Sequence, residues 1–308
     1  MSITESRNPR AHNLDSLPVR EILQLMNEED RTVADAVGAV LDPIADAVQL
    51  AVSSLAAGGR LFYAGAGTSG RIALLDAAEC PPTFGTPPEL VQVLIAGGES
   101  ALTKAQEGTE DDFELGMEDA NTRGVSGIDA VVGISASGNA RYVLGVLTHS
   151  RREGAATIGL TCNPSSAIDA LVDVAIAPVV GPEVVMGSSR LKAGTAQKMV
   201  LNMISTAAMV KLGRVYQDLM IELRPANLKL ARRVRRIVSI AADVDEDIAE
   251  RCIEQAQGNL KAAVLMAKNG GELDDAEELL DRAGNNLRAA LELIDAQTGG
   301  GRSNDYAG

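Results

Sequence analysis

The feature of this sequence that most limits its fold is a series of short apolar runs, each closed by Gly or Ser and followed by a helical stretch. A strand that is apolar at consecutive positions is buried on both faces, as in a parallel sheet covered by helices. The alternation of such runs with helices predicts an α/β layered domain over about residues 58–214. The predicted strands lie at residues 61–64, 90–96, 130–134, 156–160 and 174–180.

Helical patterns flank this domain, so that we expect four parts. Residues 1–57 form an N-terminal arm and helices, with a kink or restart after Asp42 because Pro43 interrupts the apolar pattern. Residues 58–214 are the sheet domain, which ends in an Ala-, Met- and Val-rich helix. Residues 215–242 hold a basic connecting helix that we expect to face water, and residues 243–308 an acidic helical module with a flexible tail.

The C-terminal part contains a short internal repeat. Residues 258–263 (GNLKAA) recur as 285–290 (NNLRAA), 27 residues later. Asn before Leu and Ala-Ala suits a capped, closely packed helix start, and the segment resembles small ubiquitin-associated-type helical modules. We expect this repeat to serve folding or docking rather than partner recognition.

Charge and hydropathy exclude several classes of function. The chain has 28 Lys and Arg against 42 Asp and Glu, a net charge of −14, which repels nucleic acid and anionic lipid. Its longest run without a charged residue is 15 residues, whereas a membrane-spanning helix needs about 20. The N-terminus has no basic start leading into an apolar core, as a secretion signal has. We therefore expect a cytoplasmic protein with no nucleic-acid or membrane partner.

Few residues are available for metal or nucleophilic chemistry. Cys80, Cys162 and Cys252 are scattered, and His12 and His149 are the two histidines. This pattern predicts buried free thiols and neither a disulfide framework, a zinc site nor a His-dependent triad. If this protein performs acid-base catalysis, we therefore expect carboxylate side chains to transfer the protons.

Three turns rich in glycine and hydroxyl groups point to a phosphate site. The first, residues 65–71 (GAGTSGR), fits the pattern G-x-G-x-x-G, but no acidic residue ends the next strand and no Walker lysine follows Gly70. Nucleotide binding is therefore disfavoured. Residues 134–139 (ISASGN) and 187–195 (GSSRLKAGT) are the other two turns. One such turn is ordinary loop chemistry, but three in one sheet indicate that neutral donors and helix dipoles bind an anion at its carboxyl edge.

Longer blocks around these turns resemble the N-acetylmuramic acid 6-phosphate etherase family of the sugar-isomerase (SIS) superfamily. The blocks are residues 65–71, 76–85 (DAAECPPTFG), 95–99 and 187–198, with further matches at 4–8 and 27–30. The Glu-Cys-Pro-Pro sequence is the most diagnostic, and the likeness covers essentially the whole chain. It implies an SIS-type parallel-sheet sandwich with N-terminal helices and a small C-terminal all-helical module. It also implies a homodimer.

The resemblance implies a lyase reaction in the recycling of cell-wall amino sugars. D-Lactate leaves C3 of open-chain N-acetylmuramic acid 6-phosphate, because the aldehyde acidifies the C2 proton. Water then adds to the unsaturated aldehyde at C3 and gives N-acetylglucosamine 6-phosphate. The sequence of steps needs proton donors and acceptors but no cofactor and no metal.

The resemblance also assigns roles to individual residues. Glu79 matches the acid that protonates the departing lactate oxygen, a role that burial in an apolar pocket supports. The second catalytic carboxylate aligns with Glu110, with Glu107 as the alternative on the same helical face. The base that removes the C2 proton is left open. The expected substrate contacts are Thr68, Ser69, Ser135, Ser137, Ser188 and Ser189, with Lys192 and Arg71 as charge partners.

Two other functions fit the same fold. One is a non-catalytic sugar-phosphate sensor similar to the glucokinase regulatory protein, which needs the phosphate turns but no pair of carboxylates such as Glu79 and Glu110. The other is an aldose-ketose isomerase, which shares deprotonation at C2 but has no lactyl pocket. The Glu-Cys-Pro-Pro block disfavours the isomerase.

Overall fold

The computed structural model describes residues 3–104, 106, 108–223 and 228–299. By packing, the chain forms two compact units. Unit 1 comprises Met1–Glu79 and Pro87–Ala208, and unit 2 comprises Cys80–Thr86 and Met209–Gly308. The four-part division expected from the sequence stays a prediction.

Unit 1 is built on a five-stranded parallel sheet with the strand order β2-β1-β3-β4-β5. Every residue of β1 and β3 is buried, which explains why these runs are apolar at consecutive positions. All five predicted strands are confirmed, although the fifth ends before Pro178, which has no N–H for a ladder. The strands are β1 (Leu61–Gly65), β2 (Val91–Ile95), β3 (Ala130–Ile134), β4 (Ala156–Leu160) and β5 (Val174–Ile176).

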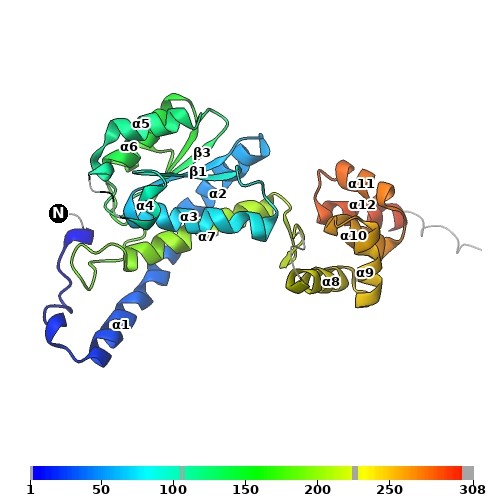
Figure 1. Ribbon diagram of the computed structural model, residues 1–308, viewed down its shortest axis with the longest axis horizontal. Coiled ribbons are helices and arrows are strands. Elements are labelled where there is room, and N and C mark those ends of the chain that lie inside the picture. The colour runs from blue at the N-terminus through cyan, green and yellow to red at the C-terminus, as the bar shows by residue number, and fades with distance from the viewer. Residues whose placement is uncertain (1–2, 105, 107, 224–227, 300–308) are drawn as a thin grey trace, which may run out of the picture. The chain divides into compact units, whose positions relative to one another are not determined.

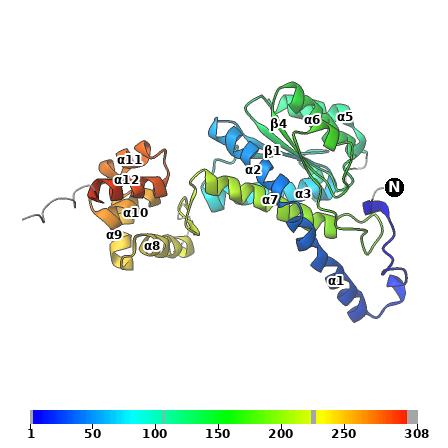
Figure 2. The same ribbon diagram turned by 180° about the vertical axis from the view of Figure 1, so that it is seen from behind.

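Helices cover both faces of this sheet (Figures 1 and 2). α2 (Leu41–Ala56) packs on one face, and α6 (Arg141–Arg152) packs on the other together with α5 (Phe113–Thr122). The helices α5 and α6 meet backbone to backbone: a Cβ on Gly116 would lie 2.1 Å from Tyr142 O, and one on Gly145 would lie 2.1 Å from Phe113 O. The α/β layered fold predicted from the sequence is confirmed.

The N-terminal helices break at a different place from the one predicted. α1 (Val19–Gly38) and α2 are separated at Ala39 and Val40, and Pro43 lies in the first turn of α2. Proline is tolerated there because first-turn N–H groups have no partner within the helix. No single described helix is long and apolar enough to cross a membrane, whereas α1 and α2 together, bent by 61°, reach the required length and composition.

The helix after β1 continues through Pro81 and Pro82, although two consecutive prolines ordinarily end a helix. α3 runs over Gly67–Phe84 and contains both prolines, which remove two N–H donors from its last turns. Contacts within unit 2 fix this end of the helix. Arg214 donates a hydrogen bond to Phe84 O at 3.1 Å, and Phe84 is buried. Tertiary packing therefore overrides the local cost of the prolines.

Unit 1 also contains a long last helix and several short helical elements. The long helix is α7 (Lys192–Lys211), the Ala-, Met- and Val-rich helix expected at the end of the sheet domain. The short elements are η1 (Ile3–Glu5), η2 (Leu14–Ser16), α4 (Ser100–Thr103), η3 (Thr109–Asp111) and η4 (Asp169–Leu171).

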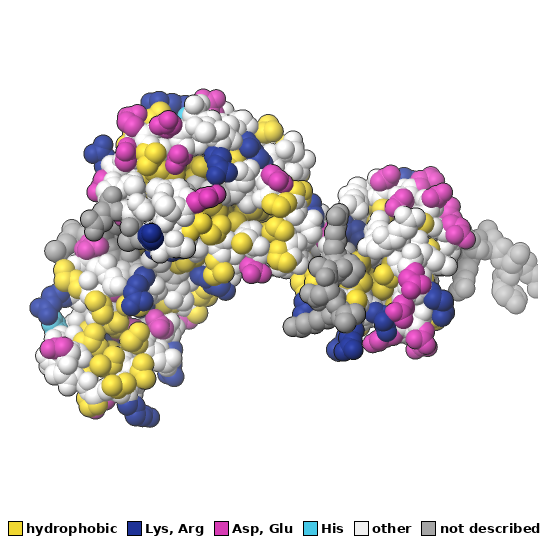
Figure 3. Space-filling model, viewed as in Figure 1, with side chains coloured by type: hydrophobic (Ala, Val, Ile, Leu, Met, Phe, Trp, Pro, Cys, Tyr) yellow, Lys and Arg dark blue, Asp and Glu magenta, His cyan; other side chains and the backbone are white. Residues whose placement is uncertain are grey.

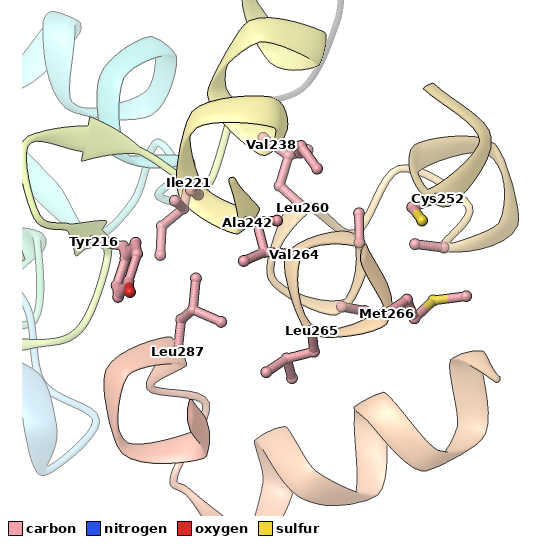
Figure 4. Close-up of a cluster of buried hydrophobic side chains, with 14 of the residues drawn as sticks. Tyr216, Ile221, Val238, Ala242, Cys252, Leu260, Val264, Leu265, Met266 and Leu287 are labelled. Carbon is pink, nitrogen blue, oxygen red and sulfur yellow. The ribbon is translucent and has the colours of Figure 1, made fainter. Parts of the chain in front are cut away.

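Unit 2 is a helical module preceded by a two-stranded hairpin, and Figure 4 shows its apolar side chains converging between the helices. Its elements are β6 (Val215–Tyr216), β7 (Leu219–Met220), α8 (Leu228–Ala242), α9 (Glu246–Gln255), α10 (Leu260–Asn269), α11 (Leu273–Arg282) and α12 (Leu287–Gly299). The repeat has the predicted capping function: Asn259 caps α10 and Asn286 caps α12 through side-chain oxygens. The basic residues at matching positions of the repeat both contact residues of the segment that precedes α8. Lys261 pairs with Glu222, and Arg288 stacks over Tyr216.

A buried carboxylate joins β1 to β3 at their amino ends. Asp129 accepts hydrogen bonds from the backbone N–H and guanidinium of Arg60 and from the N–H and hydroxyl of Ser126, at 2.8–3.1 Å. Burial raises the pKa of Asp129, but these hydrogen bonds outweigh burial and hold that pKa below its usual value. The ionised carboxylate therefore stabilises the fold above the ordinary Asp pKa, and this contribution is lost as the pH falls.

We predict that Asp129→Asn lowers the free energy of unfolding at pH 7 by about 2–3 kcal/mol, because an amide NH₂ then faces donors of Arg60 and Ser126. Urea denaturation measures the change. The difference from wild type should shrink as the pH falls below the ordinary Asp pKa, because the contribution of the ionised carboxylate to stability is lost there. Asp46→Asn, at an exposed position of α2, is the control. Equal unfolding midpoints for Asp129→Asn and wild type would contradict the assignment.

Candidate active site

The strand register brings the predicted turns to one edge of the sheet. Gly65 at the end of β1 lies opposite Ile95 of β2 and Ile134 of β3, and Ile134 lies opposite Leu160 of β4. The segments that follow these residues therefore leave the sheet at its carboxyl edge. This is where open parallel sheets bind ligands.

The turn after β3 presents hydroxyl groups in a fixed geometry. Ser135 Oγ accepts the N–H of Gly138 at 3.1 Å and lies 3.3 Å from Ser137 Oγ, which accepts the N–H of Asn139. Gly138 has a φ of +74°, and a Cβ there would lie 2.2 Å from Ser166 Oγ. Only glycine fits this position, so the turn is held against the chain that follows β4.

The turn after β1 opens a long helix. A Cβ on Gly65 would lie 2.7 Å from Gly70 N, so strand and helix approach each other closely. At the start of the 18-residue α3, the N–H groups of Ser69 and Gly70 donate to Ala66 O, so in this described turn the N–H groups of Gly67 and Thr68 are the ones that can face an anion. Thr68 is partly exposed, whereas Ser69 is buried and donates to Gln197 Oε1 at 3.1 Å.

The third turn lies beside the first. A Cβ on Gly194 would lie 3.6 Å from Ser189 O and 3.7 Å from the side-chain methyl of Thr68. The structure therefore brings Ser189 close to Thr68, and Ser188 is its partly exposed neighbour. The start of α7 is occupied internally, because the fully buried Glu183 accepts the N–H groups of Lys192 and Ala193 at 3.0 Å each.

Lys192 lies close to this turn, but its side chain already has a partner. It is 3% exposed, and its Nζ lies 2.6 Å from Glu29 Oε2 on α1. Asn8 Nδ2 donates to the same oxygen, and Arg10 pairs with Glu29 Oε1 at 3.1 Å. Burial raises the pKa of Glu29, but the bonds from Lys192 and Asn8 bring it below its usual value. A substrate contact for Lys192 stays a prediction, and it requires this ion pair to open.

The first expected catalytic carboxylate, Glu79, is exposed on α3, so the single chain does not supply the apolar burial expected for it. One turn earlier, Asp76 is buried and accepts hydrogen bonds from Tyr63 OH at 2.8 Å and from Ser205 Oγ at 3.0 Å. Asn202 donates to the same carboxylate. These bonds tie α3 to β1 and α7 and so fix the part of the helix that carries Glu79.

The second expected catalytic carboxylate, Glu110, lies in η3 on the loop between β2 and α5. Gly108, with a φ of +80°, begins this turn, and Asp112 Oδ1 caps α5 by accepting the N–H of Leu115. The Glu110 residue is exposed to solvent, but partial desolvation by neighbouring protein atoms raises its pKa, and the charge of Asp111 raises it further. Glu110 thus holds a proton more readily than an ordinary glutamate. The alternative, Glu107, lies outside the described residues.

Arg71, expected as a charge partner of the phosphate, binds protein carbonyls. Its Nε donates to Ala101 O and Leu102 O at 3.1 Å each, and its Nη2 donates to Lys104 O at 3.3 Å. The guanidinium therefore connects the turn after β1 with the loop that leads to Glu110.

Several residues of this region were not singled out from the sequence. Gln197 is 1% exposed, and among the described residues its Nε2 has no hydrogen-bond partner. Asn163, after β4, binds Ala136 O at 2.7 Å and accepts the N–H of Ile3 at 2.6 Å. Gln197, Asn8 and Glu29 lie in sequence blocks that resemble the family, so the sequence could have pointed to them. Their partners could not be predicted, because these partners are distant in sequence.

Cys80, Cys162 and Cys252 form no disulfide and are buried, as predicted. Burial, together with the charge of Glu183, raises the pKa of Cys162 to about 12. Among the described residues, no three or more His, Cys, Asp and Glu side chains are grouped to hold a metal ion.

A parallel sheet with hydroxyl-rich turns at its carboxyl edge is compatible with several α/β classes, and the family comparisons show that this chain is an SIS-domain protein. The SIS domain matches residues 117–207, and the glucokinase regulatory protein N-terminal SIS domain matches residues 43–151. Among solved structures, a phosphoheptose isomerase from Francisella tularensis superposes with a TM-score of 0.49 at 17% identity. It covers 62% of this chain and 98% of its own.

Full-length relatives then give the particular family. The N-acetylmuramic acid 6-phosphate etherase of Mycolicibacterium smegmatis is 51% identical over 94% of this chain and 97% of its own length. The etherases of Pectobacterium atrosepticum and Clostridioides difficile are 50% and 47% identical, over 94% and 95% of this chain and 95% and 96% of their own lengths. The chain belongs to the N-acetylmuramic acid 6-phosphate etherase family.

Proposed function

We propose that this chain cleaves the lactyl ether of N-acetylmuramic acid 6-phosphate and so acts as a carbon-oxygen lyase in the recycling of cell-wall amino sugars. The observation that carries the proposal is its relationship, at about 50% identity over nearly the whole chain, to proteins named for this etherase activity. A phosphorylated sugar does not cross a membrane unaided, so a cytoplasmic location is part of the proposal. The sensor and isomerase alternatives have no comparable support.

The phosphate is held by uncharged donors in this proposal. Thr68, Ser135, Ser137, Ser188 and Ser189 offer hydroxyl groups at one edge of the sheet, and the start of α3 offers N–H groups. Ser69 belongs to the same turn, with its hydroxyl proton directed to Gln197. Neutral donors suit a chain with a net charge of −14, because they bind an anion without a cluster of cations.

The carboxylates then move protons around a carbonyl-activated sugar. A base removes the C2 proton, the electron pair forms the C2–C3 double bond, and the bond from C3 to the lactyl oxygen breaks. Glu79 gives its proton to that oxygen, so lactate leaves as a neutral alcohol group. Glu110 takes a proton from the water that adds at C3, and a proton returns to C2. The raised pKa of Glu110 suits a group that must alternately hold and release a proton.

We also propose that the chain works as a homodimer. Val19 and Leu23 on α1 are 73% and 60% exposed, and Figure 3 shows apolar side chains gathered over this part of the helix. On α3, Leu75 and Ala78 are exposed beside Glu79. A second copy that covers such faces would bury apolar area and would supply the apolar surroundings that Glu79 needs as an acid.

The reaction is tested by incubating the full-length protein with N-acetylmuramic acid 6-phosphate in ¹⁸O-water. We expect release of D-lactate without the label and one ¹⁸O at C3 of the sugar, because elimination breaks the bond at C3 and water adds there. Absence of lactate release would remove the proposed function. Label in the lactate instead of at C3 would replace elimination by attack on the lactyl carbon.

A pair of substitutions separates proton transfer from binding. Glu79→Gln should lower kcat by about 100-fold or more, since the amide cannot protonate the leaving oxygen, with KM nearly unchanged. Steady-state lactate release measures both constants. The matched variant Ser137→Ala should instead raise KM several-fold and change kcat little. Turnover near the wild-type level in Glu79→Gln would exclude this residue from the mechanism.

The dimer is tested on α1. Leu23→Glu should shift the sedimentation coefficient from that of a dimer toward that of a monomer, because a charge would be buried in the contact. Ala34→Glu, at another exposed position of α1, adds the same charge and should leave the dimer intact. A monomeric wild-type protein, or a Leu23→Glu variant as dimeric as wild type, would contradict this contact.

A further inference from the structure

The side chain of Arg71 crosses from one part of the site to another. Arg71 follows Gly70 in the first turns of α3, and its guanidinium donates to the carbonyls of Ala101, Leu102 and Lys104. These carbonyls lie at the end of the four-residue helix α4, where backbone oxygens have no N–H partner within the helix. A planar guanidinium can satisfy several carbonyls at once and also favours the negative end of a helix.

Arg71 holds residues 101–104, and Glu110 follows in the same loop, of which residues 105 and 107 lie outside the described part of the chain. This loop leaves β2 through Gly97 and Gly98, both with positive φ, and a Cβ on Gly97 would lie 3.0 Å from Gln106 Cγ. At its far end Asp112 caps α5, which packs on α6. Between these two ends, the guanidinium of Arg71 supplies hydrogen bonds from a neighbouring element, and Glu110 lies six residues after the last carbonyl it binds.

We propose that Arg71 is a positioning residue, which holds Glu110 at a fixed place relative to the phosphate-binding turn and does not itself bind the phosphate. This inference rests on the proposed function, because it assigns Arg71 a part in the same reaction. The turn at Thr68 and Ser69 fixes the sugar phosphate, and Arg71, two residues after Ser69, fixes the loop of the carboxylate. One short stretch of α3 thereby sets the distance between the bound end of the substrate and a proton-transfer group.

The test is Arg71→Lys, which keeps the positive charge but loses the planar set of donors. We expect kcat for lactate release to fall by about 10- to 100-fold, because a small displacement of a catalytic group costs that much. KM, and the inhibition constant of N-acetylglucosamine 6-phosphate, should stay within about twofold of wild type. The limb of the pH-rate profile that Glu110 governs should move to lower pH as the carboxylate becomes more solvated. Arg123→Lys, at an exposed position with one long bond to Gln92, is the control.

Two outcomes would overturn the proposal. If Arg71→Lys keeps kcat and only Arg71→Met raises the inhibition constant, the residue acts through its charge on the phosphate. If kcat falls with no shift in the pH profile, and guanidine added to Arg71→Ala restores nothing, the residue does not act through Glu110.

A second measurement does not depend on activity. Hydrogen exchange followed by mass spectrometry should show faster exchange for residues 99–104 in Arg71→Lys than in wild type and in Arg123→Lys, with inorganic phosphate absent or present. Unchanged exchange in this segment would contradict the proposed hold on the loop. If the wild-type protein released no lactate, the proposed function would fail while this exchange experiment would still decide whether Arg71 fixes the segment.

Discussion

The in-register pairing of the parallel strands is the constraint on which the rest of this structure depends. Gly65, Ile95, Ile134 and Leu160 align across four strands, so the segments after them emerge at one edge. Because side chains alternate between the faces of a sheet, a slip of one residue in any strand would exchange its buried faces and displace its turn. The close contacts at Gly65 and Gly138 leave room for this one arrangement of the turns.

Three charged groups beside these turns are paired within the protein. Glu183 occupies the start of α7, Lys192 is bound to Glu29, and the guanidinium of Arg71 is bound to carbonyls. What the edge offers to a substrate is therefore a set of hydroxyl and N–H groups. In the proposed function, such a site would recognise a phosphate by geometry rather than by attraction between opposite charges. It leaves exposed or partly exposed carboxylates available for proton transfer.

The sequence was sufficient for those features that depend on local pattern, and it failed where contacts distant in sequence decide. The five strands follow from consecutive apolar residues, and the caps of α10 and α12 follow from Asn before Leu and Ala-Ala. The continuation of α3 through Pro81 and Pro82 could not be predicted, because Arg214 and the burial of Phe84 stabilise that end. The partners of Lys192 and Arg71, the predicted charge partners of the phosphate, could not be predicted from the sequence either. Lys192 meets a residue 163 positions away, and Arg71 meets carbonyls about 30 positions away.

A crystal structure with N-acetylglucosamine 6-phosphate bound tests the central claim most directly. It should place the phosphate oxygens within hydrogen-bonding distance of the hydroxyl groups of Ser135 and Ser137 and of the N–H groups at the start of α3, with C3 of the sugar facing Glu79 or Glu110. A phosphate bound to surface arginines away from the carboxyl edge of the sheet, with the sugar remote from both glutamates, would contradict the account.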